Sequence, residues 1–233
     1  MIEAILFDFD GLILDTETPE FDSWQEVFES YGVRLERRVW DWSIGRHSLD
    51  FDIYEHLSEL SGQPIERKVV RPIMRRDYLE RIERNPILPG VELYLTTAKQ
   101  MGLKLAVASS SSPGWAVGHL KSRGLLHYFE FVLSAGDVDK AKPDPELYTM
   151  AVERLGVQPQ NAFAIEDSVN GLIAAKAAGL QCVVVPNPMT RGMGFDAADM
   201  CLNSLSNMPL EKLLENLQSQ ASHRNGGLSK AKV

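Results

Sequence analysis

Short apolar runs alternate with longer amphipathic stretches along most of this chain. Runs rich in β-branched and aromatic residues are typical of buried strands. We expect such strands near residues 4–9, 104–109, 130–134, 162–166 and 181–185. The stretches between them have the length and spacing of helices. This alternation predicts an α/β fold, a doubly wound parallel sheet with right-handed crossovers.

A long segment rich in Trp, Glu and Arg separates the first two predicted strands. It is helix-like from about residue 17 to residue 85 and ends at a cluster of helix breakers, Pro86-Ile87-Leu88-Pro89-Gly90. We therefore expect a helical subdomain over 17–85, inserted into a core formed by residues 1–16 and 86–217. The polar, glycine-containing end, 218–233, is expected to be a flexible tail.

Composition narrows the class of protein without defining its chemistry. A chain of 233 residues, 44% of them hydrophobic, can form one large domain with an insertion. The net charge of −8 disfavours nucleic acid or an anionic membrane as a partner. Two cysteines, Cys182 and Cys201, do not suggest a disulfide framework. Without a signal-peptide pattern or a stretch of transmembrane length, we expect a soluble, cytoplasmic monomer.

Two carboxylates, Asp8 and Asp10, stand at the end of the first apolar run. A carboxylate in a buried strand is costly unless its charge is compensated. Because residues two apart on a strand project to the same side, this pair favours a bound hard cation such as Mg²⁺. Gly11 then allows the chain to turn tightly off the strand. The alternative is that the acids only cap a following loop.

The run Asp8-Phe9-Asp10-Gly11, followed by Asp15-Thr16, resembles the first motif of the haloacid dehalogenase superfamily. The similarity is to its branch of sugar-phosphate phosphatases and β-phosphoglucomutases. Three further motifs follow in the family's order: the serines Ser109–Ser112, the pair Lys142-Pro143, and Glu166-Asp167-Ser168 before an Ala-rich helix. The resemblance covers roughly residues 1 to 205.

The resemblance implies a role for each motif. Asp8 would be the nucleophile that forms an aspartyl-phosphate, Asp10 the general acid and base, and Lys142 the cation that stabilises the transferred phosphoryl group. Phosphate would be bound by Ser109, Ser110, Gly11 and Thr16, and Mg²⁺ by Asp8, Asp10, Glu166 and Asp167. Taken alone, the serines could instead cap the next helix, and Lys142 could be a solvated surface lysine.

The resemblance also implies that the inserted helices form a cap over the site. Its loop Trp40–His47 would place Arg46 against a phosphate or a sugar hydroxyl, and a surface arginine is the alternative. Further along, Arg67, Arg71 and Arg75 recur every four residues. This spacing favours a solvated basic face, with attraction of the substrate as the other interpretation.

Two departures bear on the choice between phosphatase and mutase. Relatives that resemble β-phosphoglucomutase often carry a histidine where this chain has Glu20, and a cap lysine where it has Met74. A mutase needs a second phosphate site with fixed cations, so losing both weakens that interpretation. We expect a Mg²⁺-dependent phosphatase of small phosphorylated metabolites, sugar or polyol phosphates above all. The alternatives are a phosphomutase and a non-catalytic binding protein.

Overall fold

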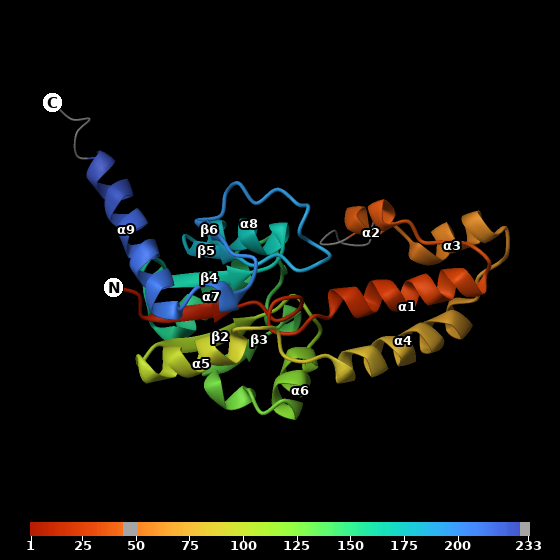
Figure 1. Ribbon diagram of the computed structural model, residues 1–233, viewed down its shortest axis with the longest axis horizontal. Helices are drawn as coiled ribbons and strands as arrows, with labels where there is room; N and C mark the ends of the chain where they lie inside the picture. The colour runs from red at the N-terminus through yellow and green to blue at the C-terminus, as the bar shows by residue number, and fades with distance from the viewer. Residues whose placement is uncertain (44–50, 229–233) are drawn as a thin grey trace.

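The computed structural model describes the chain over residues 1–43 and 51–228. Its centre is a parallel sheet of six strands in the order β3-β2-β1-β4-β5-β6 (Figure 1), which confirms the predicted fold class. The strands are β1 (Ala4–Phe7), β2 (Lys104–Ala108), β3 (Phe131–Leu133), β4 (Ala162–Glu166), β5 (Gln181–Val184) and β6 (Met200–Cys201). The sixth strand was not predicted, because two residues are too short to form a recognisable apolar run.

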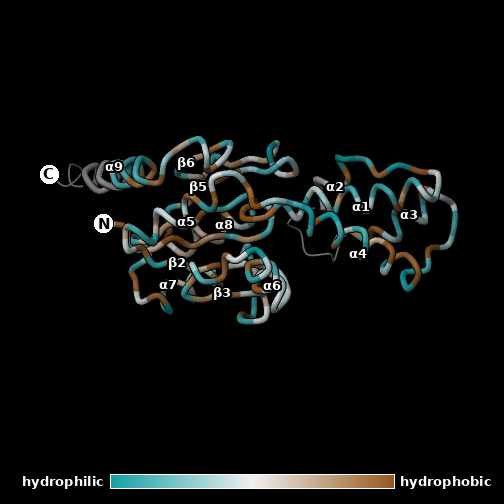
Figure 2. Tube along the Cα trace, turned by 60° about the horizontal axis from the view of Figure 1, so that its bottom comes forward, coloured by the Kyte–Doolittle hydropathy of each residue, from teal (hydrophilic) through white to brown (hydrophobic). Residues whose placement is uncertain are grey.

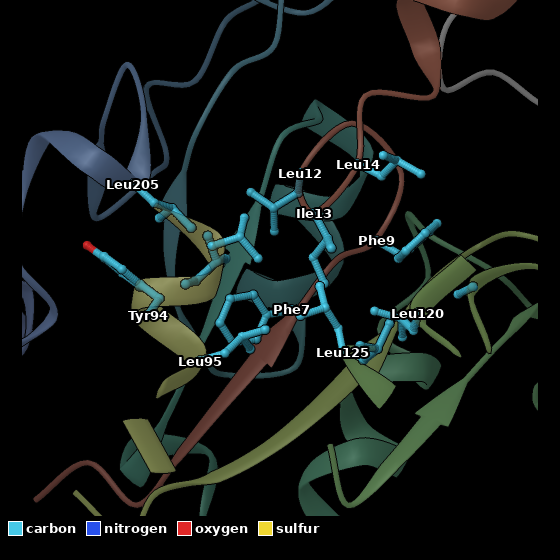
Figure 3. Packing of buried hydrophobic residues seen from close by; sticks show 14 of the residues in the cluster. Phe7, Phe9, Leu12, Ile13, Leu14, Tyr94, Leu95, Leu120, Leu125 and Leu205 are labelled. Atoms are coloured by element: carbon cyan, nitrogen blue, oxygen red, sulfur yellow. The ribbon is translucent and has the colours of Figure 1, made fainter. Parts of the chain in front are cut away.

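The two faces of the sheet carry side chains of different size. Large side chains such as Ile5 and Phe7 point to one face, where they pack on α5 (Val91–Gln100), α6 (Trp115–Ser122) and α9 (Leu210–Leu228). Figure 3 shows this layer, with Phe7, Leu95 and Leu125 among its side chains. Alanines dominate the opposite face, which packs on α7 (Glu146–Leu155) and α8 (Val169–Ala177). Because strand side chains alternate, one apolar run fills both layers.

Of the helices described between β1 and β2, all but α5 form a body beside the sheet, which we call the helical lobe (Figures 1 and 2). They are α1 (Glu17–Ser30), α2 (Arg37–Ser43), α3 (Ile53–Ser61) and α4 (Arg67–Arg84). Helices α1 and α4 lie side by side, and Arg81 of α4 forms ion pairs with Asp22 and Glu26 of α1. Figure 2 shows hydrophilic and hydrophobic segments alternating along the lobe, as its amphipathic helices require.

The two chain segments that join the lobe to the core lie against each other. The Asn85 side chain donates a hydrogen bond to the Asp15 carbonyl at 2.9 Å. Leu14 forms an isolated antiparallel bridge with Ile87, and the Leu88 amide donates to the Ile13 carbonyl at 3.0 Å. Both ends of the insertion are therefore fixed at one place, next to the end of β1.

Helix α9 continues to Leu228 and so includes residues 218–228, which the sequence analysis assigned to a flexible tail. A helix over residues 218–228 was not expected, because the segment is polar and contains Gly226 and Gly227, and flexibility over 218–233 stays a prediction. Over the described residues, no helix combines the length and hydropathy that a membrane span requires.

Candidate active site

The carboxyl ends of β1, β2 and β4 face the helical lobe (Figure 1), and a cleft of 430 Å³ lies between them. Residues from the core and from the lobe line it together. The core contributes Asp8, Asp10, Ser110, Lys142 and Asp167, and the lobe contributes Glu17, Glu20, Arg75 and Tyr78. The crevice at the carboxyl ends of the strands is where ligands bind in open parallel sheets.

Sheet register explains how three distant segments meet here. Phe7 pairs with Val107 on one side and with Ile165 on the other. One step further along each strand lie Asp8, Ala108 and Glu166. Lys142 reaches this row from the loop before α7, and its Nζ donates to Asp8 Oδ1 at 2.5 Å, to the Ala108 carbonyl at 2.7 Å and to Glu166 Oε1 at 2.7 Å.

Lys142 is buried, with 7% of its surface exposed, and the peptide bond that joins it to Pro143 is cis. Burial alone would lower the pKa of its ammonium group. The charges of Asp8 and Glu166 outweigh that effect and hold the pKa above its ordinary value. The ammonium is therefore a fixed positive charge beside Asp8, which excludes the surface-lysine alternative.

Asp8, Glu166 and Asp167 form a buried acidic cluster in which one oxygen from each lies within 4.8 Å of the others. Burial raises the pKa of Asp8 and of Asp167, and the neighbouring carboxylates raise each of them further. Lys142 opposes this rise but is a single cation among three acids. Hard oxygen ligands held this closely suit Mg²⁺, so the donor set fits that ion.

Glu166 is held by donors of the protein itself. Its Oε1 accepts hydrogen bonds from Lys142 and from the Tyr148 hydroxyl at 2.5 Å, while Oε2 accepts from the Asp167 amide and the Ser168 hydroxyl, both at 3.2 Å. The first turn of α8 leaves room for this carboxylate only because residue 171 is glycine. A Cβ there would lie 1.9 Å from Glu166.

Asp10 lines the same cleft but does not belong to the acidic cluster. Its Oδ1 accepts hydrogen bonds from the Thr16 hydroxyl at 3.0 Å and from the Trp115 indole at 2.8 Å. Its Oδ2 accepts from the hydroxyls of Ser109, at 3.1 Å, and Ser111. The carboxylate therefore lies between the predicted phosphate-binding serines and the start of α6.

Asn187 is a site residue that the sequence analysis missed. It is buried, and its Nδ2 donates to Asp167 Oδ2 at 2.6 Å. Gly11, with φ of +75°, passes so close that a Cβ would lie 2.3 Å from the side chains of both Asn187 and Asp167. The available signal was positional, because Asn187 follows β5 as the other polar residues follow their strands.

The lobe contacts the core at two places, one of them at the cleft. Arg75 and Tyr78 of α4 contact Trp115 of α6, and the Arg37 guanidinium of α2 donates to the Pro188 carbonyl at 2.7 Å. All three arginines of the expected stripe, Arg67, Arg71 and Arg75, are exposed, and the Arg75 guanidinium also lies 4.8 Å from the Trp115 ring centre. Arg46 lies outside the described residues.

Two acids of α1 face the cleft. Burial, reinforced by Asp10, raises the pKa of Glu20 to about 7, and nearby Arg75 opposes the rise. Burial and the neighbouring acids Glu20 and Asp10 raise the pKa of Glu17 to about 8. The lobe side of the cleft is therefore acidic, with Arg75 as the cation that the lobe contributes over the described residues.

Known proteins are similar to this chain in sequence and in fold. A sequence model of haloacid dehalogenase-like hydrolases matches residues 5–185. The chain is 46% identical to YhcW of Bacillus subtilis over 220 residues, which cover 94% of this chain and all of YhcW. It is 34% identical to hexitol phosphatase B of Escherichia coli K12, covering 91% of this chain and 97% of that protein.

The fold is also similar to a solved structure. CbbY from Rhodobacter sphaeroides, crystallised in complex with phosphate, superposes with a TM-score of 0.71 at 30% sequence identity. The match covers 88% of this chain and 96% of CbbY.

Proposed function

The chain belongs to the haloacid dehalogenase-like hydrolases, and we propose that it is a Mg²⁺-dependent phosphatase of small sugar or polyol phosphates. The observation that carries this proposal is the buried contact between Lys142 and Asp8 at the floor of the cleft. A carboxylate beside a fixed cation can approach a phosphate dianion that it would otherwise repel. The name of the related hexitol phosphatase B supports the substrate class.

The first chemical step uses Asp8 and Asp10. A carboxylate oxygen of Asp8 attacks phosphorus, the bond from phosphorus to the ester oxygen breaks, and Asp10 gives its proton to the departing alcohol. Lys142 stabilises the charge on the transferred group. In the second step Asp10 takes a proton from water, the water oxygen bonds to phosphorus, and the bond to Asp8 breaks to release phosphate.

The remaining residues bind and orient. We assign phosphate contacts to Ser109, Ser110 and Thr16, with Gly11 allowing the close approach. Mg²⁺ would be held by Asp8, Asp167 and the backbone carbonyl of Asp10, and when bound it supplies positive charge that offsets repulsion between nucleophile and phosphate. Because Glu166 already accepts hydrogen bonds from Lys142 and Tyr148, we assign it to holding Lys142 beside this site.

We also propose that residues 17–85 form a cap, with residues 1–16 and 86–217 as the core. Contacts of the lobe with both Trp115 and Pro188 support this division. Over the described residues the lobe offers a second phosphate one cation, Arg75, beside the acids Glu17 and Glu20, which favours substrates with one phosphate and many hydroxyls. This arrangement favours hydrolysis over a phosphomutase reaction.

The test is phosphate release from sorbitol 6-phosphate, glucose 6-phosphate and 4-nitrophenyl phosphate, with and without Mg²⁺. We expect Mg²⁺-dependent release by the wild type and none by Asp8→Asn. Release by purified, folded Asp8→Asn would overturn the assignment of the nucleophile. Conversion of β-glucose 1-phosphate, primed with its bisphosphate, that outpaces release would show a mutase, and no turnover of any ester would show a binding protein.

A further inference from the structure

Four hydrogen bonds fix the Asp10 carboxylate, and they differ in what they can do once substrate binds. Ser109, Ser111 and Thr16 offer hydroxyls, which rotate and can turn to a phosphate oxygen. The Trp115 indole N–H can only donate, and it points at Asp10 Oδ1 from 2.8 Å. It is therefore the partner that stays with Asp10 when the hydroxyls engage the phosphate.

The Trp115 indole is held by residues of both the helical lobe and the core. On the lobe side the Tyr78 ring stacks on it, with centres 5.9 Å apart and planes 13° apart, and the Arg75 guanidinium lies 4.8 Å from its centre. On the core side His119 packs edge-on at 4.3 Å. Trp115 is the first residue of α6, so its backbone is fixed by the core. The direction of its N–H thus depends on α4 and α6 together.

From these contacts we propose that Trp115 is a positioning residue for Asp10. Its N–H orients the general acid, and the Tyr78 ring and Arg75 guanidinium of α4 hold the indole in that orientation. The proposal rests on the proposed function, since it assigns Asp10 the proton transfers of the phosphatase reaction. It adds a residue of α6 to the site. It also makes proton transfer depend on how the helical lobe packs against the core.

The test separates proton donation from general damage by changing the leaving group. A 4-nitrophenolate needs little protonation to depart, whereas the alkoxide of sorbitol 6-phosphate needs a proton. Because kcat/KM reports steps up to formation of the aspartyl-phosphate, it isolates the acid role of Asp10. We compare wild type, Trp115→Phe, which keeps an aromatic ring without the donor, and Trp115→His, which keeps a ring N–H.

For Trp115→Phe we expect kcat/KM for sorbitol 6-phosphate to fall on the order of tenfold or more, because positioned acids contribute about 10²–10⁴-fold. The value for 4-nitrophenyl phosphate should change less than about threefold, and Trp115→His should recover part of the loss. The matched control is Trp24→Phe, a buried tryptophan of α1 that packs on Tyr54. Its kcat/KM for each ester should equal that of the wild type.

Equal losses on the two esters, or no loss on either, would overturn the role of Trp115. A thermal unfolding scan of each variant accompanies the kinetics, and the ratio of the two kcat/KM values is independent of the fraction of folded enzyme. Failure of the proposed function has a different signature. The wild type would then release no phosphate, or Asp8→Asn would remain active.

Discussion

The ammonium of Lys142 lies 2.5 Å from Asp8 Oδ1, and both side chains are buried. A second carboxylate, Glu166, contacts the same ammonium at 2.7 Å. One cation therefore balances two acids, with the third acid, Asp167, beside them. Such a group is stable only while its partners are all present, since each charge has lost its water.

Removing the cation should therefore destabilise the protein as well as inactivate it. Lys142→Met leaves Asp8 and Glu166 buried without their partner. Breaking a buried ion pair costs about 3–5 kcal/mol, and we expect a loss of that size in the free energy of unfolding, partly relieved where a carboxylate takes up a proton. Urea unfolding at neutral pH, without Mg²⁺, measures it.

Lys140 provides the matched control, because it is exposed and two residues away. Lys140→Met should change the free energy of unfolding by no more than about 0.5 kcal/mol and leave phosphate release unchanged. Equal stability of the two variants would contradict the account of the buried charges.

The sequence alone predicted the sheet and the polar residues at the carboxyl ends of its strands. Asp8, Ser109 and Glu166 each follow an apolar run, and parallel strands bring such ends together. The register decides which of these residues share Lys142, and it depends on side-chain packing across the whole sheet. Apolar periodicity could therefore indicate that Asp8 and Glu166 are close, but it could not assign their shared partner.

Sequence patterns could not predict the contacts between the helical lobe and the core. Trp115 follows a glycine turn and resembles any aromatic residue of a core helix. Its place beside Asp10 depends on how α6 lies against α4, which no local pattern contains. Asn187 is similar, because the loop after β5 carries no periodic signal. Helix α9 was not predicted over residues 218–228, because the polar, glycine-containing composition of that segment is typical of a flexible tail.

A second prediction concerns Gly171, where a Cβ would overlap the Glu166 carboxylate. Gly171→Ala should lower the free energy of unfolding by about 1–3 kcal/mol, as for other overpacked sites. It should also reduce kcat by more than about tenfold, because Glu166 would push Lys142 away from Asp8 and small misplacements are costly in catalysis. Chemical unfolding and phosphate release measure the two effects.

Gly118 is the comparison residue, since it too lies within a helix but has no atom within 4 Å of its Cβ position. Gly118→Ala should raise stability by roughly 0.5–1 kcal/mol, because alanine favours the helix. Equal changes in the free energy of unfolding for Gly171→Ala and Gly118→Ala would contradict the predicted overlap with Glu166.

The third prediction is a pH dependence of stability without Mg²⁺. Below pH 4.5, the ordinary value for glutamate, Glu20 is protonated in the folded and unfolded chain alike. Above it the unfolded chain releases the proton, while folded Glu20 keeps it until about pH 7. Stability should therefore fall as pH rises through this window, and on to about pH 8 for Glu17.

Melting temperatures across this range, in a chelating buffer, measure the effect. Glu20→Gln should decline less steeply than the wild type and melt higher at pH 8, because glutamine has no proton to release. Glu153→Gln, a change at an exposed acid of α7, should follow the wild type. A Glu20→Gln curve parallel to that of the wild type would contradict the raised pKa.

The fourth prediction is that replacing Asp167 has opposite effects on stability without and with Mg²⁺. Asp167 is repelled by Asp8 and Glu166, so Asp167→Asn should stabilise the protein in chelator. The same change removes a proposed Mg²⁺ ligand, and Mg²⁺ should then stabilise the wild type far more than the variant. At a hundred times the dissociation constant, binding contributes about 2.7 kcal/mol. The two melting curves should therefore change order between chelator and saturating Mg²⁺.

Asp139→Asn separates the loss of a ligand from the loss of a charge, because Asp139 is an exposed acid three residues before Lys142. It should gain as much stability from Mg²⁺ as the wild type does. An equal gain for Asp167→Asn would place the ion elsewhere. Without any gain in the wild type, the acidic cluster would be a repulsive group offset by Lys142 alone, and the structure would have to tolerate that repulsion without a metal.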